Sequence, residues 1–98
     1  MDHIFRPLQR IVMLQGLERD PKRSLPSEMI QRLLKEYGQH CGIAEVNEQI
    51  NWLENRGYVK TQRLEGSSLV MVEILRPGIE VATGLVRAEG IDPPPLED

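Results

Sequence analysis

Several features that define other protein classes are missing from this sequence of 98 residues. Its single cysteine, Cys41, cannot form a disulfide within the chain, which favours a reducing compartment such as the cytoplasm. No stretch approaches the roughly 20 apolar residues that a membrane-spanning helix needs. The first ten residues, MDHIFRPLQR, lack the basic and apolar regions of a secretory signal. We therefore expect a cytoplasmic, one-domain protein that folds without disulfides.

The residues that catalysis or metal binding requires are also scarce. The chain has no glycine-rich phosphate loop and no serine or cysteine in a nucleophile motif. His40 and Cys41 are adjacent but lack the further ligands of a zinc site, which normally has about four. Glu45 and Glu48 are three residues apart, but such pairs on a helix more often face solvent than transfer protons. The sequence predicts that the protein is not an enzyme and binds no metal or cofactor.

A strong excess of basic charge is missing as well. The formal charge is −3, from 12 basic and 15 acidic residues. From residue 88 onward the chain has four acids and no base, so the rest has 12 basic and 11 acidic residues, or about +1. Nucleic-acid-binding domains usually carry a basic patch. The charge balance alone therefore does not favour binding to DNA.

Hydrophobic periodicity predicts four helices and one β-hairpin. In chain order, the predicted elements are a helix over 4–18, a helix from Pro26 or Ser27 to Tyr37, a helix over 43–56, strands over 58–64 and 69–75, and a helix over about 77–88. This order predicts a mainly α fold with a small hairpin (α+β), in one domain over residues 1–88. Residues 89–98 are acidic and rich in proline, and we expect a disordered or extended tail.

The second and third predicted helices have distinct faces. The buried side of the second is expected to hold Met29, Ile30, Leu33, Leu34 and Tyr37. In the third, steps of 100° per residue place Val46, Ile50 and Leu53 together as a core stripe. The opposite side then carries Ala44, Asn47, Glu48, Asn51 and Asn55. That side is either a solvated face or a surface that reads DNA, because asparagine can bond to adenine in the major groove.

Two apolar features leave alternatives open. Trp52, the only tryptophan, lies on a flank of the third helix, either as an aromatic at the edge of the core or as an interface anchor. The strand over 69–75 has apolar residues on both faces, with Leu69 and Met71 on the face that also carries Glu73. Either the N-terminal helix and tail or another protein chain is expected to cover that second face.

The element order and two motifs resemble a winged helix-turn-helix domain of the MarR- and ArsR-type transcriptional regulators. The segment VNEQINWLENRGYV (46–59) resembles the end of their recognition helix, and LRPGIEVA (75–82) resembles the element that leaves the wing. LPSEMIQRLL (25–34) resembles the first helix of the helix-turn-helix pair. The resemblance covers roughly residues 5 to 85. The chain also has the length of small winged-helix proteins that mobile elements and prophages encode.

The resemblance implies a recognition helix in the major groove and a wing along the phosphates. Base contacts would come from the third helix, at Ala44, Glu45, Asn47, Glu48, Asn51 and Asn55. Contacts to the DNA backbone would come from Ser27, Arg32, Lys35, Lys60 and Arg63. The chain departs from the family pattern at its wing tip, Glu65-Gly66-Ser67-Ser68, where DNA-binding wings usually carry Arg or Lys.

Two functions follow from these patterns. The first is a transcriptional regulator that binds double-stranded DNA, as a homodimer that places two recognition helices in successive major grooves. The alternative is a winged-helix module that binds another protein and not DNA, with Trp52, Leu69 and Met71 as interface anchors. The near-neutral body and the acidic third helix favour the alternative, whereas the family pattern favours DNA.

Overall fold

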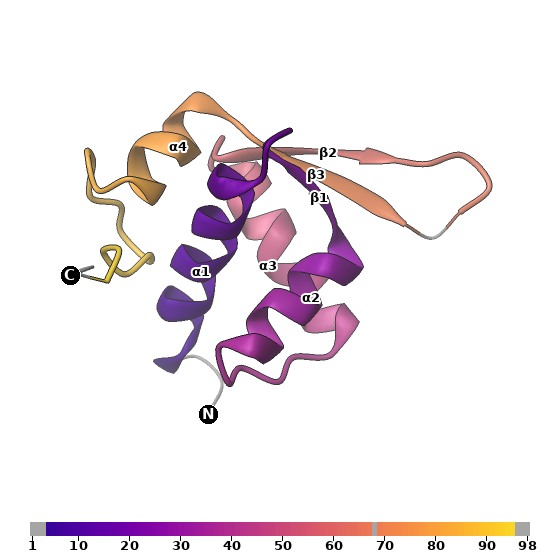
Figure 1. Ribbon diagram of the computed structural model, residues 1–98, viewed down its shortest axis with the longest axis horizontal. Helices are drawn as coiled ribbons and strands as arrows, with labels where there is room; N and C mark the ends of the chain where they lie inside the picture. The colour runs from indigo at the N-terminus through magenta and orange to yellow at the C-terminus, as the bar shows by residue number, and fades with distance from the viewer. Residues whose placement is uncertain (1–3, 68, 96–98) are drawn as a thin grey trace.

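The computed structural model describes residues 4–67 and 69–95. Residues 1–3 of the predicted domain, Ser68 of the predicted turn and residues 96–98 of the predicted tail lie outside the described residues. The first three helices pack beneath a sheet of three strands, the fourth lies beside the end of the sheet against the first, and a long hairpin projects from the helical body (Figure 1). The predicted α+β architecture and the order helix, helix, helix, hairpin, helix are confirmed.

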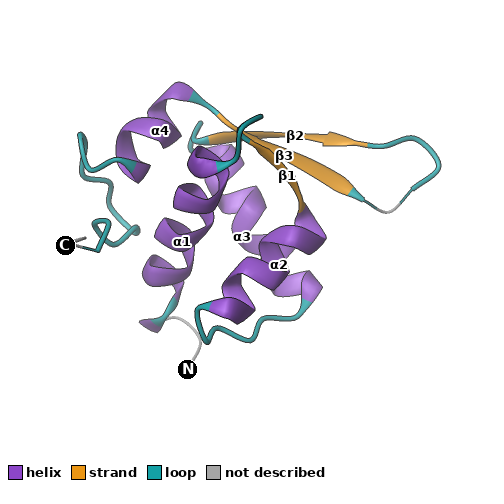
Figure 2. Cartoon of the chain, viewed as in Figure 1, coloured by secondary structure: helices purple, strands orange, loops and turns teal. Residues whose placement is uncertain are grey.

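The first helix, α1 (Arg6–Arg19), is the central helix of the fold (Figure 2). Pro7 lies in its first turn, where the missing N–H group has no helical partner to lose. From Gln9 to Gln15 every residue is buried, because other helices or the sheet surround this part of α1. The helix begins later than predicted, since Ile4 and Phe5 precede it and are 71% and 47% exposed.

Helices α2 (Ser27–Glu36) and α3 (Ile43–Asn55) form the helix-turn-helix pair. Each is followed closely by a glycine with positive φ, Gly38 (77°) and Gly57 (82°), which lets the chain turn sharply away from the helix. Ile30 and Leu34 of α2 are fully buried, as predicted. Met29 and Tyr37 are 46% and 50% exposed, so their predicted burial is wrong. The buried stripe of α2 is narrower than its apolar residues suggest.

The sheet contains one strand more than the sequence predicts. The predicted hairpin forms as β2 (Val59–Arg63) and β3 (Val70–Ile74), and β1 (Ser24–Pro26) adds to the other edge of β3 in the antiparallel order β1-β3-β2. Met71 of β3 lies opposite Pro26 of β1 in the register and is half-buried. The edge of β3 that β2 leaves free is therefore paired with a third strand of the same chain.

The last helix, α4 (Arg76–Ala82), is shorter than predicted. It ends before Gly84, whose φ of 83° is a left-handed conformation that a helix cannot continue through. Gly78 allows α4 to approach the start of β2, because a Cβ atom there would lie 2.4 Å from the carbonyl oxygen of Tyr58. The same oxygen accepts a hydrogen bond from the Leu75 N–H at 2.9 Å, which fixes the approach.

The described part of the tail, up to residue 95, returns along α1 and packs against the domain (Figure 1). Ile91 is only 7% exposed and belongs to the hydrophobic core. The Asp92 N–H donates to the carbonyl oxygen of Pro7 at 3.1 Å. Residues 91 and 92 therefore contact the domain, because the isoleucine among the prolines supplies an apolar anchor. The disordered or extended character of the tail stays a prediction.

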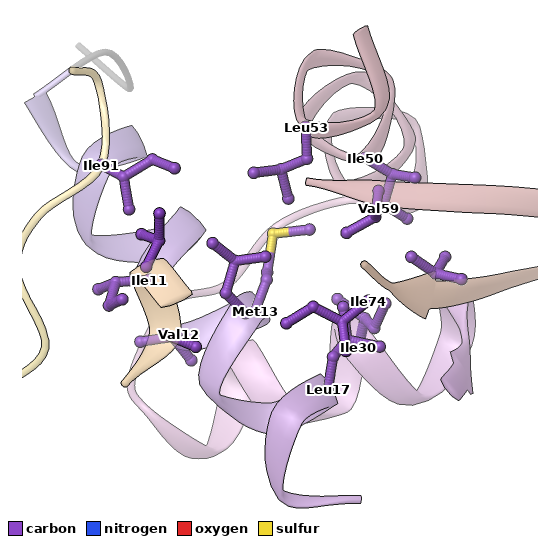
Figure 3. Close-up of a cluster of buried hydrophobic side chains, with 14 of the residues drawn as sticks. Ile11, Val12, Met13, Leu17, Ile30, Ile50, Leu53, Val59, Ile74 and Ile91 are labelled. Atoms are coloured by element: carbon purple, nitrogen blue, oxygen red, sulfur yellow. The ribbon is translucent and has the colours of Figure 1, made fainter. Parts of the chain in front are cut away.

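The core connects all layers of the fold. Side chains of α1, α3, the sheet and the tail converge in one cluster, in which Met13 of α1 lies near the centre (Figure 3). Val46, Ile50 and Leu53 of α3 are 0%, 2% and 0% exposed. The predicted inward stripe of α3 is thus confirmed, and the opposite side of α3 faces outward. In the described residues, no helix is both long enough and apolar enough to cross a bilayer.

Candidate nucleic-acid interface

The outward side of α3 presents small and polar groups. Ala44, Glu48, Asn51 and Asn55 are exposed, whereas Glu45 and Asn47 are half-buried. The two glutamates would repel phosphates, while the asparagine amides can both donate and accept hydrogen bonds. This surface is therefore suited to contact with uncharged hydrogen-bonding groups, such as the edges of bases, rather than with phosphates.

A cleft joins this side of α3 to the hairpin. It has a volume of about 120 Å³ and is lined by Asn47, Ile50, Asn51, Thr61, Arg63 and Val70. Two predicted base-contacting asparagines and one predicted phosphate-contacting arginine therefore line one concave surface. Arg63 is exposed and lies opposite Val70 in the strand register.

Lys60 lies on the other face of the sheet. Because side chains alternate along a strand, Lys60 and Arg63, three residues apart, point to opposite faces. Lys60 pairs with Glu73 of β3, with 3.7 Å between Nζ and Oε1. The same outer face carries Met71. The structure thus places Lys60 and Arg63, which the resemblance grouped as contacts to the DNA backbone, on opposite faces of the sheet.

Two cations of α2 border a second and larger cleft, of about 490 Å³, at the start of α3. Its lining consists of Gln31, Arg32, Lys35, His40, Cys41 and Gly42. The Gln31 side-chain amide donates to the Cys41 carbonyl at 2.9 Å, which fixes the connection between the helices. Arg32 and Lys35 are both exposed, as a phosphate contact requires.

Ser27 differs from the other predicted contacts to the DNA backbone. It is the first residue of α2 and only 3% exposed, so its hydroxyl does not reach the surface.

Leu69 and Met71, predicted as interface anchors, are both half-buried, Leu69 directly before β3 and Met71 within it. Their predicted role in an interface stays a prediction.

A polar network that the sequence did not indicate holds α3 against α1. The Arg10 Nε donates to Gln49 Oε1 at 2.8 Å, and the Gln49 amide donates to Gln9 Oε1. The Gln9 amide donates in turn to Gln39 Oε1 at 3.1 Å. Arg10, Gln49 and Gln9 are all less than 9% exposed. Buried polar groups in a connected network fix the relative position of the elements that carry them.

Trp52 lies between two guanidinium groups. The Cζ atoms of Arg10 and Arg56 are each 3.7 Å from the centroid of its ring. Trp52 is half-buried and packs against the core beside Arg10 of α1, so it is an aromatic at the edge of the core, and its role as an interface anchor stays a prediction. Arg56 directly follows α3, and its four-residue spacing from Trp52 is the sequence signal that could have indicated one half of this stack.

Arginine charges gather around this stack. Burial lowers the pKa of Arg10, and the nearby charges of Arg6 and Arg56 lower it further. Arg6 also pairs with Glu48 of α3, with 3.5 Å between Nη2 and Oε1. The carboxylate of Glu48 is thus partly neutralised. The flank of α3 next to α1 is therefore basic, although α3 itself is acidic.

A carboxylate near the end of α3 holds the hairpin in place. Glu54 Oε2 accepts hydrogen bonds from both the backbone N–H and the hydroxyl of Thr61, each at 2.9 Å. Thr61 lines the cleft that contains Asn47 and Asn51. Glu54 therefore sets the position of β2 relative to α3. No local sequence pattern indicates this contact.

The described residues contain no group of three or more His, Cys, Asp or Glu side chains that is placed to hold a metal ion. Cys41 lies at the larger cleft beside His40.

Solved structures, one of them described as a transcriptional regulator homologue, share this fold. RosR of H. salinarum, in the complex RosR-S1, aligns with a TM-score of 0.67 and 17% identity over 85% of this chain and 71% of that chain. A second RosR structure, grown from NaBr, aligns with a TM-score of 0.66 over 76% and 66%. A transcriptional regulator homologue from Pyrococcus horikoshii OT3 gives 0.59 at 27% identity over 83% and 74%.

These likenesses show that the chain has the winged-helix fold of such regulators. No family model and no curated protein matches the sequence. The predicted relation to the MarR or ArsR type and the prophage association stay predictions.

Proposed function

We propose that this protein is a cytoplasmic transcriptional regulator that binds double-stranded DNA through α3 and the β2–β3 hairpin. The observation that carries the proposal is the cleft in which Asn47, Asn51 and Arg63 lie together. In a major groove, the asparagines would reach base edges while Arg63 would reach a neighbouring phosphate. The likeness in fold to a Pyrococcus protein described as a transcriptional regulator homologue supports the same function.

Other cations extend the proposed contact along the DNA backbone. Arg32 and Lys35 of α2 border the larger cleft, which lies next to the start of α3. Each phosphate contact contributes to an affinity that falls steeply as salt rises. Ser27 is left out of the proposed contact because it is buried. As a homodimer, the protein would place its two α3 helices about 34 Å apart, in successive major grooves.

The experiment is a titration of a fluorescent mixed-sequence duplex by anisotropy, at about 50 and about 200 mM salt. The wild-type protein is expected to bind at the lower salt and to lose affinity at the higher. Arg63→Ala should reduce the affinity for every duplex, whereas Asn51→Ala should reduce it most for the preferred sequence. If the wild-type protein binds no duplex at either salt concentration, the proposal fails.

A specific observation favours a second function, binding to another protein. Met71 lies half-buried on the outer sheet face, and the pocket there, of about 240 Å³, also contains Lys60 and Glu73. Such a face mixes apolar and charged groups, as protein interfaces do. In this alternative, Met71→Asp would abolish binding to a partner while thermal unfolding showed an intact fold. Retention of the partner by both Met71→Asp and Trp52→Ala would exclude it.

A further inference from the structure

The Trp52 stack, formed by Arg10, Trp52 and Arg56, has an inner and an outer side. Both guanidinium carbons lie 3.7 Å from the ring centroid, and two such groups cannot occupy the same face of the ring at that distance. They therefore cover opposite faces. Arg10 comes from α1 and is 8% exposed, whereas Arg56 follows α3 and is exposed. Arg10 is thus the inner group and Arg56 the outer one.

Buried contacts fix the inner side. Arg10 donates from Nε to Gln49 Oε1 at 2.8 Å and from Nη1 to the carbonyl oxygen of Gly90 at 2.9 Å. The tail also touches the edge of the indole, since a Cβ atom on Gly90 would lie 2.8 Å from Cζ2 of Trp52. The indole is therefore held by α1 on one face and by the tail at its edge. Arg56 rests on a support that cannot easily move.

The stack lies beside the proposed DNA-contacting side of α3. At 100° per residue, Trp52 lies about 100° further around the helix than Asn51, and Arg56 lies about 140° further than Asn51. Asn47 and Asn51 border the cleft with the hairpin, where Arg63 lies. Arg63 and Arg56 therefore lie on opposite flanks of the outward side of α3. A major groove about 12 Å wide has phosphates along both of its edges.

Resting on the proposed function, we propose that Arg56 contacts a phosphate on the groove edge opposite the hairpin, and that Trp52 is the positioning residue that aims it. The partner group is the sugar-phosphate backbone of double-stranded DNA. A guanidinium stacked on an aromatic ring keeps its N–H groups free at the edge of its plane, where they can donate to two phosphate oxygens. The contact explains how an acidic helix can lie near DNA, because its cationic neighbours face the phosphates.

The surrounding charges agree with an anionic partner. Arg6 and Arg56 both approach the buried guanidinium of Arg10 closely enough to lower its pKa. Among the described residues, Glu48 is the carboxylate that pairs with a member of this group, through Arg6. A phosphate beside Arg56 would relieve the repulsion among the three cations. An acidic segment of a protein could do the same, and the experiment separates the two.

The test compares four proteins by the same duplex titration: the wild type, Arg56→Ala, Arg56→Lys and the control Lys22→Ala. Lys22 is an exposed cation before β1, at the sheet edge away from β2. We expect Arg56→Ala to weaken binding about tenfold at low salt and to reduce the slope of log K against log salt by about 0.9, the value for one phosphate. Lys22→Ala should change neither quantity.

Arg56→Lys tests the stacked geometry. Lysine keeps the charge but not the planar, stacked group, so we expect an affinity between those of the wild type and Arg56→Ala, with the wild-type salt slope. If Arg56→Ala behaves like Lys22→Ala, the proposal is overturned. That result, combined with a clear loss in Arg63→Ala, would leave the proposed function intact. Absence of duplex binding by the wild type would overturn both.

The positioning role is tested by combining two variants. If Trp52 acts through Arg56, Trp52→Leu should weaken binding several-fold in the wild type but cause no further loss in Arg56→Ala. Equal losses in both backgrounds would show that Trp52 does not act by aiming Arg56. Arg56 is exposed, so its variants are expected to fold even if Trp52→Leu does not, and thermal unfolding checks each protein.

Fluorescence gives an independent readout. Trp52 is the only tryptophan in the chain, so its emission reports on the stack directly. We expect duplex binding to change the emission of the wild type and to change that of Arg56→Ala less. An emission that stays constant while anisotropy shows saturation would place the DNA away from the stack and contradict the proposal. Binding of an acidic peptide with equal affinity, and competition with DNA, would contradict its specificity for phosphate.

Discussion

Replacing Glu54 by alanine should separate the hairpin from α3. The change removes two hydrogen bonds, from the N–H and the hydroxyl of Thr61 to Oε2, both at 2.9 Å. Hydrogen bonds to a charged group contribute about 1.5–3 kcal/mol each. Glu54 and Thr61 are half-buried, so water can replace part of what is lost. We therefore expect the free energy of unfolding to fall by about 2–3 kcal/mol, which for a domain of this size lowers Tm by roughly 8–24 °C.

The assay is thermal and urea unfolding followed by circular dichroism, with Thr61→Val and the double variant as partners. Thr61→Val removes the hydroxyl but keeps the backbone N–H, so its own loss should be about half that of Glu54→Ala. The double variant should lose about 1 kcal/mol less than the sum, because the two residues share one interaction. A loss below about 0.5 kcal/mol for Glu54→Ala, or strict additivity with Thr61→Val, would refute the clamp.

Three further changes probe other parts of the molecule. Gly78→Ala should destabilise the fold by about 3 kcal/mol in urea unfolding, because the Cβ atom of the alanine would lie 2.4 Å from the Tyr58 carbonyl oxygen. A loss near zero would contradict this contact. Glu48→Gln should raise duplex affinity a few-fold by removing an exposed acid, and weaker binding would contradict the proposed orientation of α3. The loss of the 3.5 Å pair between Glu48 and Arg6 should change the free energy of unfolding by less than about 1 kcal/mol. Ile91→Ala should cost about 2 kcal/mol, because the side chain is 7% exposed, and an unchanged Tm would show that the tail is not part of the core.

The elements that the sequence predicted well are those whose signal is local. Val46, Ile50 and Leu53 repeat at helical spacing, and Gly57 has a backbone conformation that ends α3. The β1 strand lacks such a signal, because it is three residues long and includes Pro26. It exists through pairing with β3, a contact between segments far apart in the chain. No local pattern contains that information.

The candidate site was predicted in part for the same reason. The outward side of α3 follows from periodicity, and it contains Asn51, which borders the cleft with Arg63. That Lys60 would face away from Arg63 could also have been read from strand alternation. The role of Arg10 could not, because its partners Gln49 and Gly90 lie 39 and 80 residues away along the chain.

The docked tail changes what counts as the functional part of this polypeptide. A domain boundary chosen by composition would exclude residues 89–98 as a tail outside the domain. Yet the Gly90 carbonyl binds Arg10, and Arg10 supports the indole next to the side of α3 that we propose to face DNA. A protein shortened at residue 88 would thus have an altered surface beside α3 even if it stayed folded. Binding measured on such a fragment would describe the fragment and not the chain with its tail.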